Sequence, residues 1–399
     1  MTLTSSLSIR FAPVVFTALS ALAGCSSENS GNPSPGPDPG DAGLLDASKS
    51  DADPGQPGPK APAVSIDSSF AAGSGITDAT HRIYAAAPGP NGATYVALRK
   101  AGGSIGWGNG TLLRRYLADG TLDVSFATQG ELPTTLVANP AALATDSEGR
   151  ILVGGSGFPD STTTDTGKEI VVVRVTPAGA VDTTYGTGGR TKLNFSAANT
   201  WSSALHVRSD HGALLAVYGR TNGKDSFGTF LIGATGAAVT GFGTSGFLGS
   251  TSSTEYGLTI GGDALVPTST QLERFGADGK SKGAAIPTRV SGAKAGKDGS
   301  LTAVVTDGKA SKLARFSADG KEDASFVAVP LAAGYRDFVV LDGGAVFYSD
   351  SEGLSWVPPK GGSSTNVVKS NALSRLKLTP EGKLLVGATN YTKIVRYVF

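Results

Sequence analysis

The sequence predicts an all-β protein whose main domain, residues 64–399, is a seven-bladed β-propeller. Three observations lead to this fold class. A short phrase recurs at intervals of nearly sixty residues, a second marker recurs seven times, and residues 64–399 show no amphipathic helical periodicity of useful length. Glycine makes up 56 of the 399 residues, which favours short strands joined by tight turns.

The recurring phrase is a hydrophobic residue, Asp, any residue, Ser or Thr, and an aromatic residue. Good copies are Ile66–Phe70, Leu122–Phe126 and Val181–Tyr185, and their aspartates are 56 and then 59 residues apart. A weaker copy spans 239–243, and one clear later copy spans 322–326. Repetition over this length indicates one supersecondary unit copied in series.

The second marker is a pair of residues at the end of a strand, followed by a turn that contains glycine. Its first position falls at Arg115, Arg174, Leu231, Arg274, Arg315, Trp356 and Arg396, in steps of 59, 57, 43, 41, 41 and 40 residues. Three of the turns read Ala-Asp-Gly, which is a strong signal for a reverse turn between strands. Units of this length with three or four strands each are typical of propeller blades, so seven copies predict seven blades.

The two ends of the domain are complementary, which predicts a closed ring. The seventh unit stops at Phe399, before its turn and its copy of the phrase. The copy at Ile66–Phe70 has no unit before it, so it can complete the last blade. Closure by this N-terminal strand leaves no unpaired sheet edge. The alternative is an open solenoid, which would need atypical capping repeats.

Residues 1–24 have the features of a secretory signal peptide. Arg10 precedes an apolar run, residues 11–24, that has the length of a signal-peptide core and is too short to span a bilayer. The run leads into Leu22-Ala23-Gly24-Cys25, which resembles the lipobox of bacterial lipoproteins at all four positions. The resemblance implies cleavage between Gly24 and Cys25, lipidation of Cys25, and stable membrane anchoring by several acyl chains. The alternative is an ordinary secretory signal with a chance cysteine.

Residues 25–63 are expected to form the lipidated cysteine and a disordered linker. Residues 26–63 contain eight prolines, six acidic residues and two lysines, with few apolar side chains, so the segment cannot bury a core. Ser26 follows Cys25 and, by resemblance to enteric sorting rules, favours the outer membrane. We therefore expect a lipid-anchored protein of the cell envelope.

One whole unit resembles the bacterial delta-sixty repeat. The resemblance is carried by Gly149–Gly155, Val172–Val175 and Val181–Gly189. It is good over residues 64–250 and weaker over 251–399. The family's spacing is similar to that of β-propellers, and most of its members have no assigned function. The resemblance therefore implies a fold and leaves the activity open.

The residues of the phrase are expected to be structural. Each aspartate can accept backbone N–H bonds in an Asx-type turn, and the aromatic residue three positions later would pack between blades. A residue repeated once per blade occupies equivalent places around a ring, so these aspartates do not assemble one catalytic site. The structural positions are Asp67, Phe70, Asp123, Phe126, Asp182, Tyr185, Asp323 and Phe326.

Five of the seven marker positions are arginines. In a ring they would form a circle of cations on one rim, and one hypothesis is an anion site for a carboxylated or phosphorylated glycan. The alternative is that each guanidinium donates to carbonyls of a neighbouring blade or to the turn aspartate. The candidates for this anion ring are Arg115, Arg174, Arg274, Arg315 and Arg396.

Composition narrows the choice of partners. The formal net charge of +1 gives no reason to expect nucleic acid. His81, His206 and His211 lie in different units without metal-ligand spacing, so neither a metal nor a cofactor is expected. The glycine-rich segment 103–110 precedes no helix that could hold a phosphate, and its Trp107 is a weaker candidate for stacking on a sugar.

Two functions fit these features. The first is a non-enzymatic surface lipoprotein, a monomer whose propeller binds a protein or glycan through its loop faces. The alternative is an enzyme, a lyase or hydrolase of envelope polysaccharide, which needs acid, base or metal residues that converge at the central funnel. Two carboxylates or a His–carboxylate pair facing each other there would favour the enzyme, whereas a funnel of Gly, Ala, Ser and Val would oppose it.

Overall fold

The computed structural model describes residues 59–100, 111–134, 137, 139–156, 169–195, 197, 199–250, 257–307, 310–332, 334–388 and 392–399. The predicted signal peptide, Cys25, most of the predicted linker and Trp107 lie outside these residues. The propeller belongs to a single unit that spans Pro57–Phe399. In the described residues, no helix has the length and apolar character required to cross a membrane.

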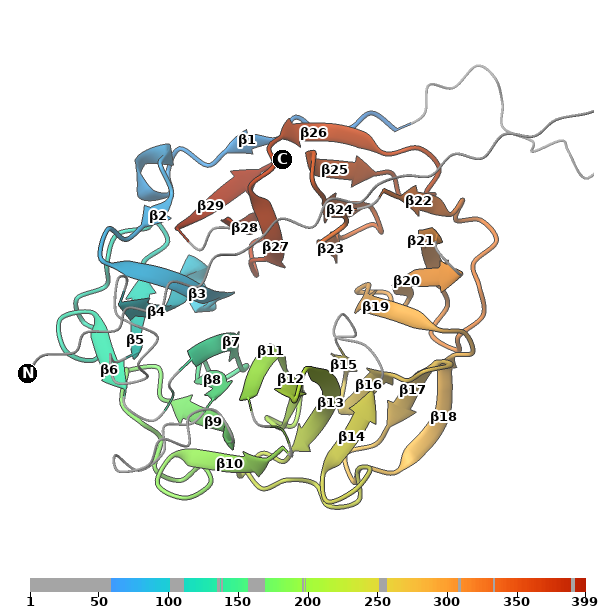
Figure 1. The fold of residues 1–399 in the computed structure, drawn as a ribbon. Coiled ribbons are helices and arrows are strands. Elements are labelled where there is room, and N and C mark those ends of the chain that lie inside the picture. Colours follow the sequence, from blue (N-terminus) through green and yellow to red (C-terminus); the bar gives the residue numbers. More distant parts are fainter. Residues whose placement is uncertain are drawn as a thin grey trace, which may run out of the picture. The chain divides into compact units, whose positions relative to one another are not determined.

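The described chain forms seven antiparallel sheets, which are the blades of a β-propeller (Figure 1). In blades 1 to 6, four strands pair in chain order. Blade 1 consists of β3 (His81–Pro88), β4 (Thr94–Lys100), β5 (Thr111–Tyr116) and β6 (Glu131–Thr134). Blade 2 consists of β7 (Asn139–Thr145), β8 (Ile151–Ser156), β9 (Glu169–Val175) and β10 (Arg190–Asn194). Blade 3 consists of β11 (Asn199–Val207), β12 (Ala213–Thr221), β13 (Lys224–Ile232) and β14 (Phe247–Ser250).

The remaining blades follow the same plan. Blade 4 consists of β15 (Leu258–Ile260), β16 (Asp263–Pro267), β17 (Leu272–Phe275) and β18 (Ser281–Ile286). Blade 5 consists of β19 (Val290–Ala295), β20 (Leu301–Asp307), β21 (Ala310–Phe316) and β22 (Val329–Leu331). Blade 6 consists of β23 (Asp337–Val340), β24 (Val346–Ser349), β25 (Gly353–Val357) and β26 (Thr365–Lys369). Blade 7 contains β27 (Leu373–Leu378), β28 (Leu384–Ala388), β29 (Lys393–Val398), β1 (Ser65–Ile66) and β2 (Ile76–Thr77); the described helices are η1 (Ala71–Gly73) and η2 (Pro90–Gly92).

The N-terminal strand closes the ring, as the sequence predicts. β1 is antiparallel to β29, with Ser65 opposite Val398 and Ile66 opposite Tyr397. β2 pairs with the other end of β29, where Ile76 lies opposite Ile394. Blade 7 therefore joins the two ends of the domain, and the seven-bladed all-β fold predicted from the sequence is confirmed.

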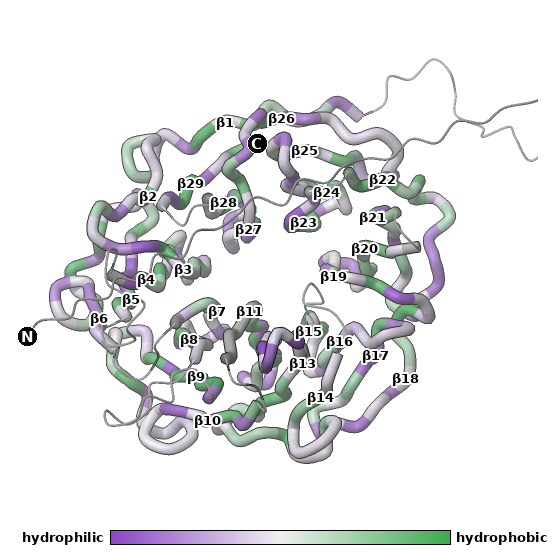
Figure 2. The backbone as a smooth tube through the Cα atoms, in the orientation of Figure 1, coloured by the Kyte–Doolittle hydropathy of each residue, from purple (hydrophilic) through white to green (hydrophobic). Residues whose placement is uncertain are grey.

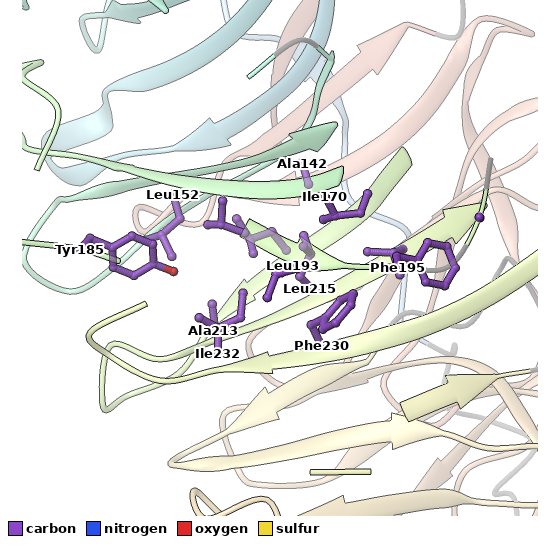
Figure 3. Packing of buried hydrophobic residues seen from close by; sticks show 14 residues of the cluster. Ala142, Leu152, Ile170, Tyr185, Leu193, Phe195, Ala213, Leu215, Phe230 and Ile232 are labelled. Carbon is purple, nitrogen blue, oxygen red and sulfur yellow. The ribbon is translucent and has the colours of Figure 1, made fainter. Parts of the chain in front are cut away.

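The hydrophobic core is divided among the contacts between blades. Among the described residues, each of the seven interfaces between neighbouring blades contains one buried cluster. Figure 3 shows the cluster between blades 2 and 3, where Tyr185 and Leu193 meet Leu215 and Phe230. Burial at about 25 cal/mol per Å² of apolar surface makes these clusters the main source of stability. A blade is therefore stable only beside its neighbours.

The first strand of each blade lies nearest the centre of the ring (Figure 1). These strands contact one another in order all round the centre, from β3 through β27 and back to β3. Their composition is uneven, because β7 is largely hydrophobic whereas β19 and β23 carry hydrophilic residues (Figure 2). The side chains on these inner strands define the candidate site.

Candidate functional site

In blade 1 the recurring phrase, Leu122–Phe126, forms a hydrogen-bonded turn between the third strand, β5, and the fourth strand, β6. In blade 1, the N–H of Asp123 donates to the Arg115 carbonyl at 2.9 Å. Asp123 Oδ1 accepts from the N–H and hydroxyl of Ser125 at 3.0 and 2.6 Å, and Oδ2 accepts from Arg115 Nε at 2.7 Å. This is the geometry of an Asx-type turn. These contacts hold the pKa of Asp123 below its ordinary value, and the hydrogen bond from the Ser125 hydroxyl contributes most.

The same turn recurs in other blades. Asp182 accepts from Thr184 and from Arg174 Nε at 2.7 Å, and Asp67 accepts from Ser69 and from Arg396 Nε at 2.8 Å. Burial alone would raise the pKa of Asp182, but the hydrogen bonds from Thr184 and Arg174 outweigh it, so the pKa is lowered.

The copy in blade 5 differs from the others in its arginine contacts. Asp323 keeps the contacts to Ser325 at 2.9 and 2.6 Å. In the described structure Arg315 instead donates to the carbonyls of Pro359 and Gly344. The carboxylate of this turn therefore lacks the direct arginine hydrogen bond found in blades 1, 2 and 7.

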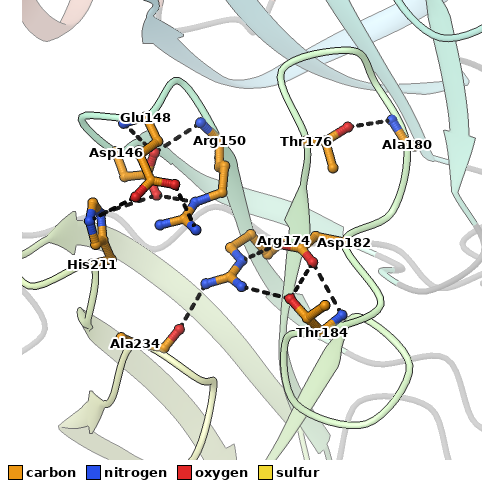
Figure 4. Close-up of polar contacts among 10 residues, drawn as sticks. All are labelled: Asp146, Glu148, Arg150, Arg174, Thr176, Ala180, Asp182, Thr184, His211 and Ala234. Carbon is orange, nitrogen blue, oxygen red and sulfur yellow. Dashed lines mark hydrogen bonds and ion pairs between the residues drawn. The ribbon is translucent and has the colours of Figure 1, made fainter.

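The arginine side chains connect neighbouring blades. Arg174 Nη1 donates to the Ala234 carbonyl of blade 3 at 2.7 Å (Figure 4). The Arg174 guanidinium also lies over the ring of Tyr185 at 4.6 Å. Arg115 reaches the Pro177 carbonyl of blade 2 in the same way, at 2.7 Å. The turn also crosses by its backbone, because the N–H of Ala127 donates to the Ala178 carbonyl of blade 2. The phrase is thus a joint between blades.

Gly179 is required at this joint by two features. Its φ is +89°, in the left-handed region that favours glycine. A Cβ at this position would also lie 2.5 Å from the backbone nitrogen of Ala127. The turn glycine that follows the arginine marker therefore permits close approach between blades.

The five arginines proposed for an anion ring lie in separate blades and do not converge on one point. Arg274 has the weakest partners, the Ala318 carbonyl at 3.3 Å and Asp263 Oδ2 at 3.9 Å. The others donate to aspartates or carbonyls of the joint. This geometry favours the structural role, and the anion ring stays a hypothesis that needs a binding test.

A cavity of about 440 Å³ occupies the centre of the ring. Its walls come mainly from the first strands of blades 1, 2, 3, 5, 6 and 7. One sector is apolar and consists largely of small side chains, including Ala85, Ala141, Ala142 and Ala204, together with Leu143 and Leu205. The opposite sector contains five cationic side chains, Lys294, Arg336, Arg375, Lys377 and Lys393. We call these the alanine sector and the basic sector.

One carboxylate, Asp337, accompanies the five cations among the described lining residues. Asp337 Oδ2 accepts from the N–H of Leu376 at 2.9 Å, and Oδ1 accepts from its neighbour Phe338 at 2.8 Å. Lys294 Nζ lies 3.7 Å from Oδ1. This carboxylate therefore links blade 6 to blade 7, and its single negative charge neutralises the charge of at most one of the cations.

Lys377 is the cation with the most perturbed environment. Burial is the main cause that lowers its pKa to about 8, and the nearby charge of Lys294 adds to the effect. Asp337 opposes the shift without cancelling it. Within the described residues, the Lys377 ammonium has no hydrogen-bond or ion-pair partner. His206, in the alanine sector, also has a pKa well below its ordinary value, because of burial first and of Lys377 and Lys294 next, so it is neutral at pH 7.

The expectation that the three histidines lie in different units is wrong, because His206 in β11 and His211 in the β11–β12 turn both belong to blade 3. His81 and His211 are held by acidic side chains outside the cavity. His81 Nδ1 lies 3.1 Å from Asp78 Oδ1. His211, in the β11–β12 turn of blade 3, reaches Glu148 of blade 2 at 3.1 Å and Asp146 at 3.6 Å (Figure 4). No cluster of three or more metal-binding side chains occurs in the part of the chain that the structure describes.

Sequence reasoning did not find the basic sector. The funnel is neither the carboxylate pair that would favour an enzyme nor the purely small-residue lining that would oppose one. The only available signal was weak, because Lys294 and Lys377 lie in strands of mixed polar and apolar residues that begin their blades. Sequence spacing alone could not show that these two strands face the same cavity.

Comparison with known proteins supports the fold. The model of a family described as "Domain of unknown function (DUF5122) beta-propeller" matches residues 101–126. A search of curated proteins found no match. Virginiamycin B lyase from Staphylococcus aureus, solved as a catalytically inactive variant with quinupristin, is similar in structure, with a TM-score of 0.51 and 14% identity over 82% of this chain and 97% of that one.

A weaker likeness is to a putative 6-phosphogluconolactonase from Bacteroides uniformis. Its TM-score is 0.46 and its identity 13%, over 76% of this chain and 91% of that one. The likeness to virginiamycin B lyase, at 14% identity, shows a shared fold alone, and function has to be argued from the site.

Proposed function

We propose that this chain is a cell-envelope lipoprotein whose propeller is a non-enzymatic binding module for an acidic glycan or protein, with the central cavity and its rim as the binding site. The observation that carries the proposal is the charge of the cavity, where five cationic side chains accompany one carboxylate among the described lining residues. Clefts lined by one sign of charge concentrate the field and attract ligands of opposite sign.

The lining favours binding over catalysis. Glycoside hydrolysis generally uses two carboxyl groups that flank the scissile bond. Here Asp337 has no second carboxylate opposite it among the described lining residues, and it already accepts two backbone N–H groups. A lone, fully engaged carboxylate is poorly suited to proton transfer.

The alternative function is a polysaccharide lyase, and one observation favours it. The pKa of Lys377 is lowered to about 8, so a fraction of this amine is neutral near physiological pH and suited to act as a general base. His206 faces the same cavity and is also neutral. Turnover therefore has to be measured together with binding.

Binding and turnover can be measured in one experiment on the full chain in detergent. The probe is polygalacturonate, an acidic glycan, and neutral dextran is the control. We expect saturable, salt-sensitive retention of polygalacturonate, no retention of dextran, and no unsaturated product in the ultraviolet absorbance. Accumulating product would establish the lyase instead, and absence of retention would contradict binding of an acidic glycan.

Membrane anchoring is the second part of the proposal, supported by the resemblance of Leu22-Ala23-Gly24-Cys25 to a lipobox. Cys25→Ser should abolish labelling by an alkyne-tagged fatty acid and release the protein from the membrane fraction, because the acyl chains supply the anchoring free energy. The matched control Ser27→Ala should label and sediment as the wild type does. Continued sedimentation of the Cys25→Ser variant with membranes would contradict the anchor.

A further inference from the structure

The two sectors of the central cavity together are complementary to an amphiphilic ligand. The alanine sector contributes Ala85 from β3, Ala141 from β7 and Ala204 from β11, which are half-buried and whose short side chains leave room in the lumen. The basic sector faces the same space from blades 5 to 7. A volume of about 440 Å³ lies within the range of sites for small organic molecules.

The basic sector has an unbalanced positive charge. Arg336 is held by its donation to the Asn371 carbonyl at 3.1 Å and to the Leu373 carbonyl. Lys294 approaches Asp337, whose oxygens also accept backbone N–H groups. Lys377 is left without a partner among the described residues, beside the like charge of Lys294. An unpaired, partly desolvated ammonium is unfavourable, and a bound anion would relieve that cost.

We infer that the central cavity binds a small organic carboxylate, whose carboxylate group accepts hydrogen bonds from Lys377 and Lys294 and whose apolar body lies against the alanine sector. The inference rests on the proposed function, because it takes the cavity as the binding site, and it names the chemical class of the ligand. A bare inorganic anion would leave the alanine sector wet, and an organic cation would be repelled by the basic sector.

Binding should be linked to proton uptake. The charged groups nearest Lys377 are Lys294 from β19, Asp337 from β23 and Arg375 from its own strand. The other charged or titratable groups that line the same cavity are His206 from β11, Tyr84 from β3, Arg336 and Lys393. A carboxylate placed among them raises the pKa of Lys377 from about 8, because it favours the charged amine. Above that pH the complex therefore binds more protons than the free protein, and affinity falls as the pH rises through 8.

The test is isothermal titration of the full chain in detergent with three molecules that share one body: 3-phenylpropanoate, 3-phenylpropanol and 3-phenylpropylamine. Inorganic phosphate is the fourth probe. We expect the carboxylate to bind at least about tenfold more tightly than the alcohol and phosphate, and the amine to show no binding, because the head group meets the basic sector. At about pH 8.5, the binding heat in two buffers of different ionisation enthalpy should report proton uptake.

Variants of Lys377 connect the binding to the site. Lys377→Met keeps the length of the side chain without its charge. It should weaken the binding of 3-phenylpropanoate at least about tenfold and abolish the proton uptake on binding. Lys377→Arg keeps the charge and should retain binding without proton uptake, because guanidinium does not titrate in this range. The control Lys321→Met changes a lysine whose side chain is 84% exposed in a turn of blade 5, and should bind as the wild type does.

The inference is overturned if phenylpropanoate does not bind, if phosphate binds equally well, or if folded Lys377→Met binds as the wild type does. Folding of each variant is checked by its thermal transition. A negative result for the small-carboxylate site can be distinguished from a negative result for the binding module. Polygalacturonate retained without turnover, together with no binding of phenylpropanoate, would leave the module in place and refute the small-carboxylate site.

Discussion

Asp67→Asn should destabilise the propeller by opening the contact that joins its two ends. Asp67 is 5% exposed and accepts from Arg396 Nε and Lys383 Nζ, both at 2.8 Å. The Arg396 guanidinium lies 4.3 Å from the ring centre of Phe70 and is itself buried. Asparagine has nearly the same shape and can still accept from Ser69, but it offers no charge to the two cations.

The magnitude follows from the burial of the pair. Removing one partner of a buried ion pair costs about 3–5 kcal/mol, because the other charge is left uncompensated. We take about 3 kcal/mol, since asparagine retains one acceptor oxygen. With an unfolding entropy of about 2.1 cal/mol/K per residue over roughly 335 residues, the expected fall in Tm is about 4 °C.

The assay is thermal unfolding of wild type, Asp67→Asn and the matched control Asp323→Asn. Asp323 occupies the same turn in blade 5, but its described partner is Ser325 and Arg315 donates elsewhere. The control should therefore lose no more than about 1 kcal/mol. Equal melting of wild type and Asp67→Asn, or an equal loss in the two variants, would refute the closure argument.

The pH dependence of the same variant supplies a second check. Burial would raise the pKa of Asp67, but the hydrogen bonds, led by the one from Lys383, hold it far below its ordinary value of 3.8. A lowered native pKa contributes stability that is complete above the unfolded value and lost as the pH falls below it. The difference between wild type and Asp67→Asn should therefore be constant near neutrality and shrink below about pH 4.

Two further predictions concern the cations. Arg315→Gln should lower the Tm, because the Arg315 guanidinium donates to the carbonyls of Pro359 and Gly344 and lies 4.5 Å over the ring of Phe326. The variant should bind polygalacturonate as the wild type does. Lost binding with an unchanged Tm would instead support the anion ring. Lys377→Met should stabilise the fold by about 1–2 kcal/mol at pH 7, because the lowered pKa means that the charged amine opposes folding and solvent screens this half-buried side chain in part. The stability difference between Lys377→Met and the wild type should narrow as the pH rises from 8 to about 10.5. In this range the native wild type has released the Lys377 proton while the unfolded chain still holds it, so the wild type gains stability with pH. Denaturant unfolding at several pH values in this range measures the difference.

Most of the fold could be predicted because it is repetitive. One marker recurs in all seven units and one phrase recurs in several of them, so each copy is an independent observation of the same local structure. Even the closure was visible, since Ile66–Phe70 supplies what the unit ending at Phe399 lacks. Structural residues repeat because each interface between blades presents the same packing problem.

The candidate site could not be predicted in this way because it does not repeat. Lys294 and Lys377 are 83 residues apart in sequence and occupy different blades, and neither belongs to a motif. Their proximity depends on the ring, which places the first strands of the blades around one centre. The same is true of the alanine sector, whose members read in sequence as ordinary core residues of β3, β7 and β11.

The sequence by itself determined the number of blades, the joint between them and the strand that closes the ring, because these depend on local turn chemistry and on patterns within a unit. Only the tertiary structure decided that the arginine of a joint binds the aspartate of its own blade while it donates to a backbone carbonyl of the next blade, and that the unpaired charge lies at the centre. The physical reason is that electrostatic surroundings depend on distance in space, and a closed ring makes neighbours of residues that no sequence period relates.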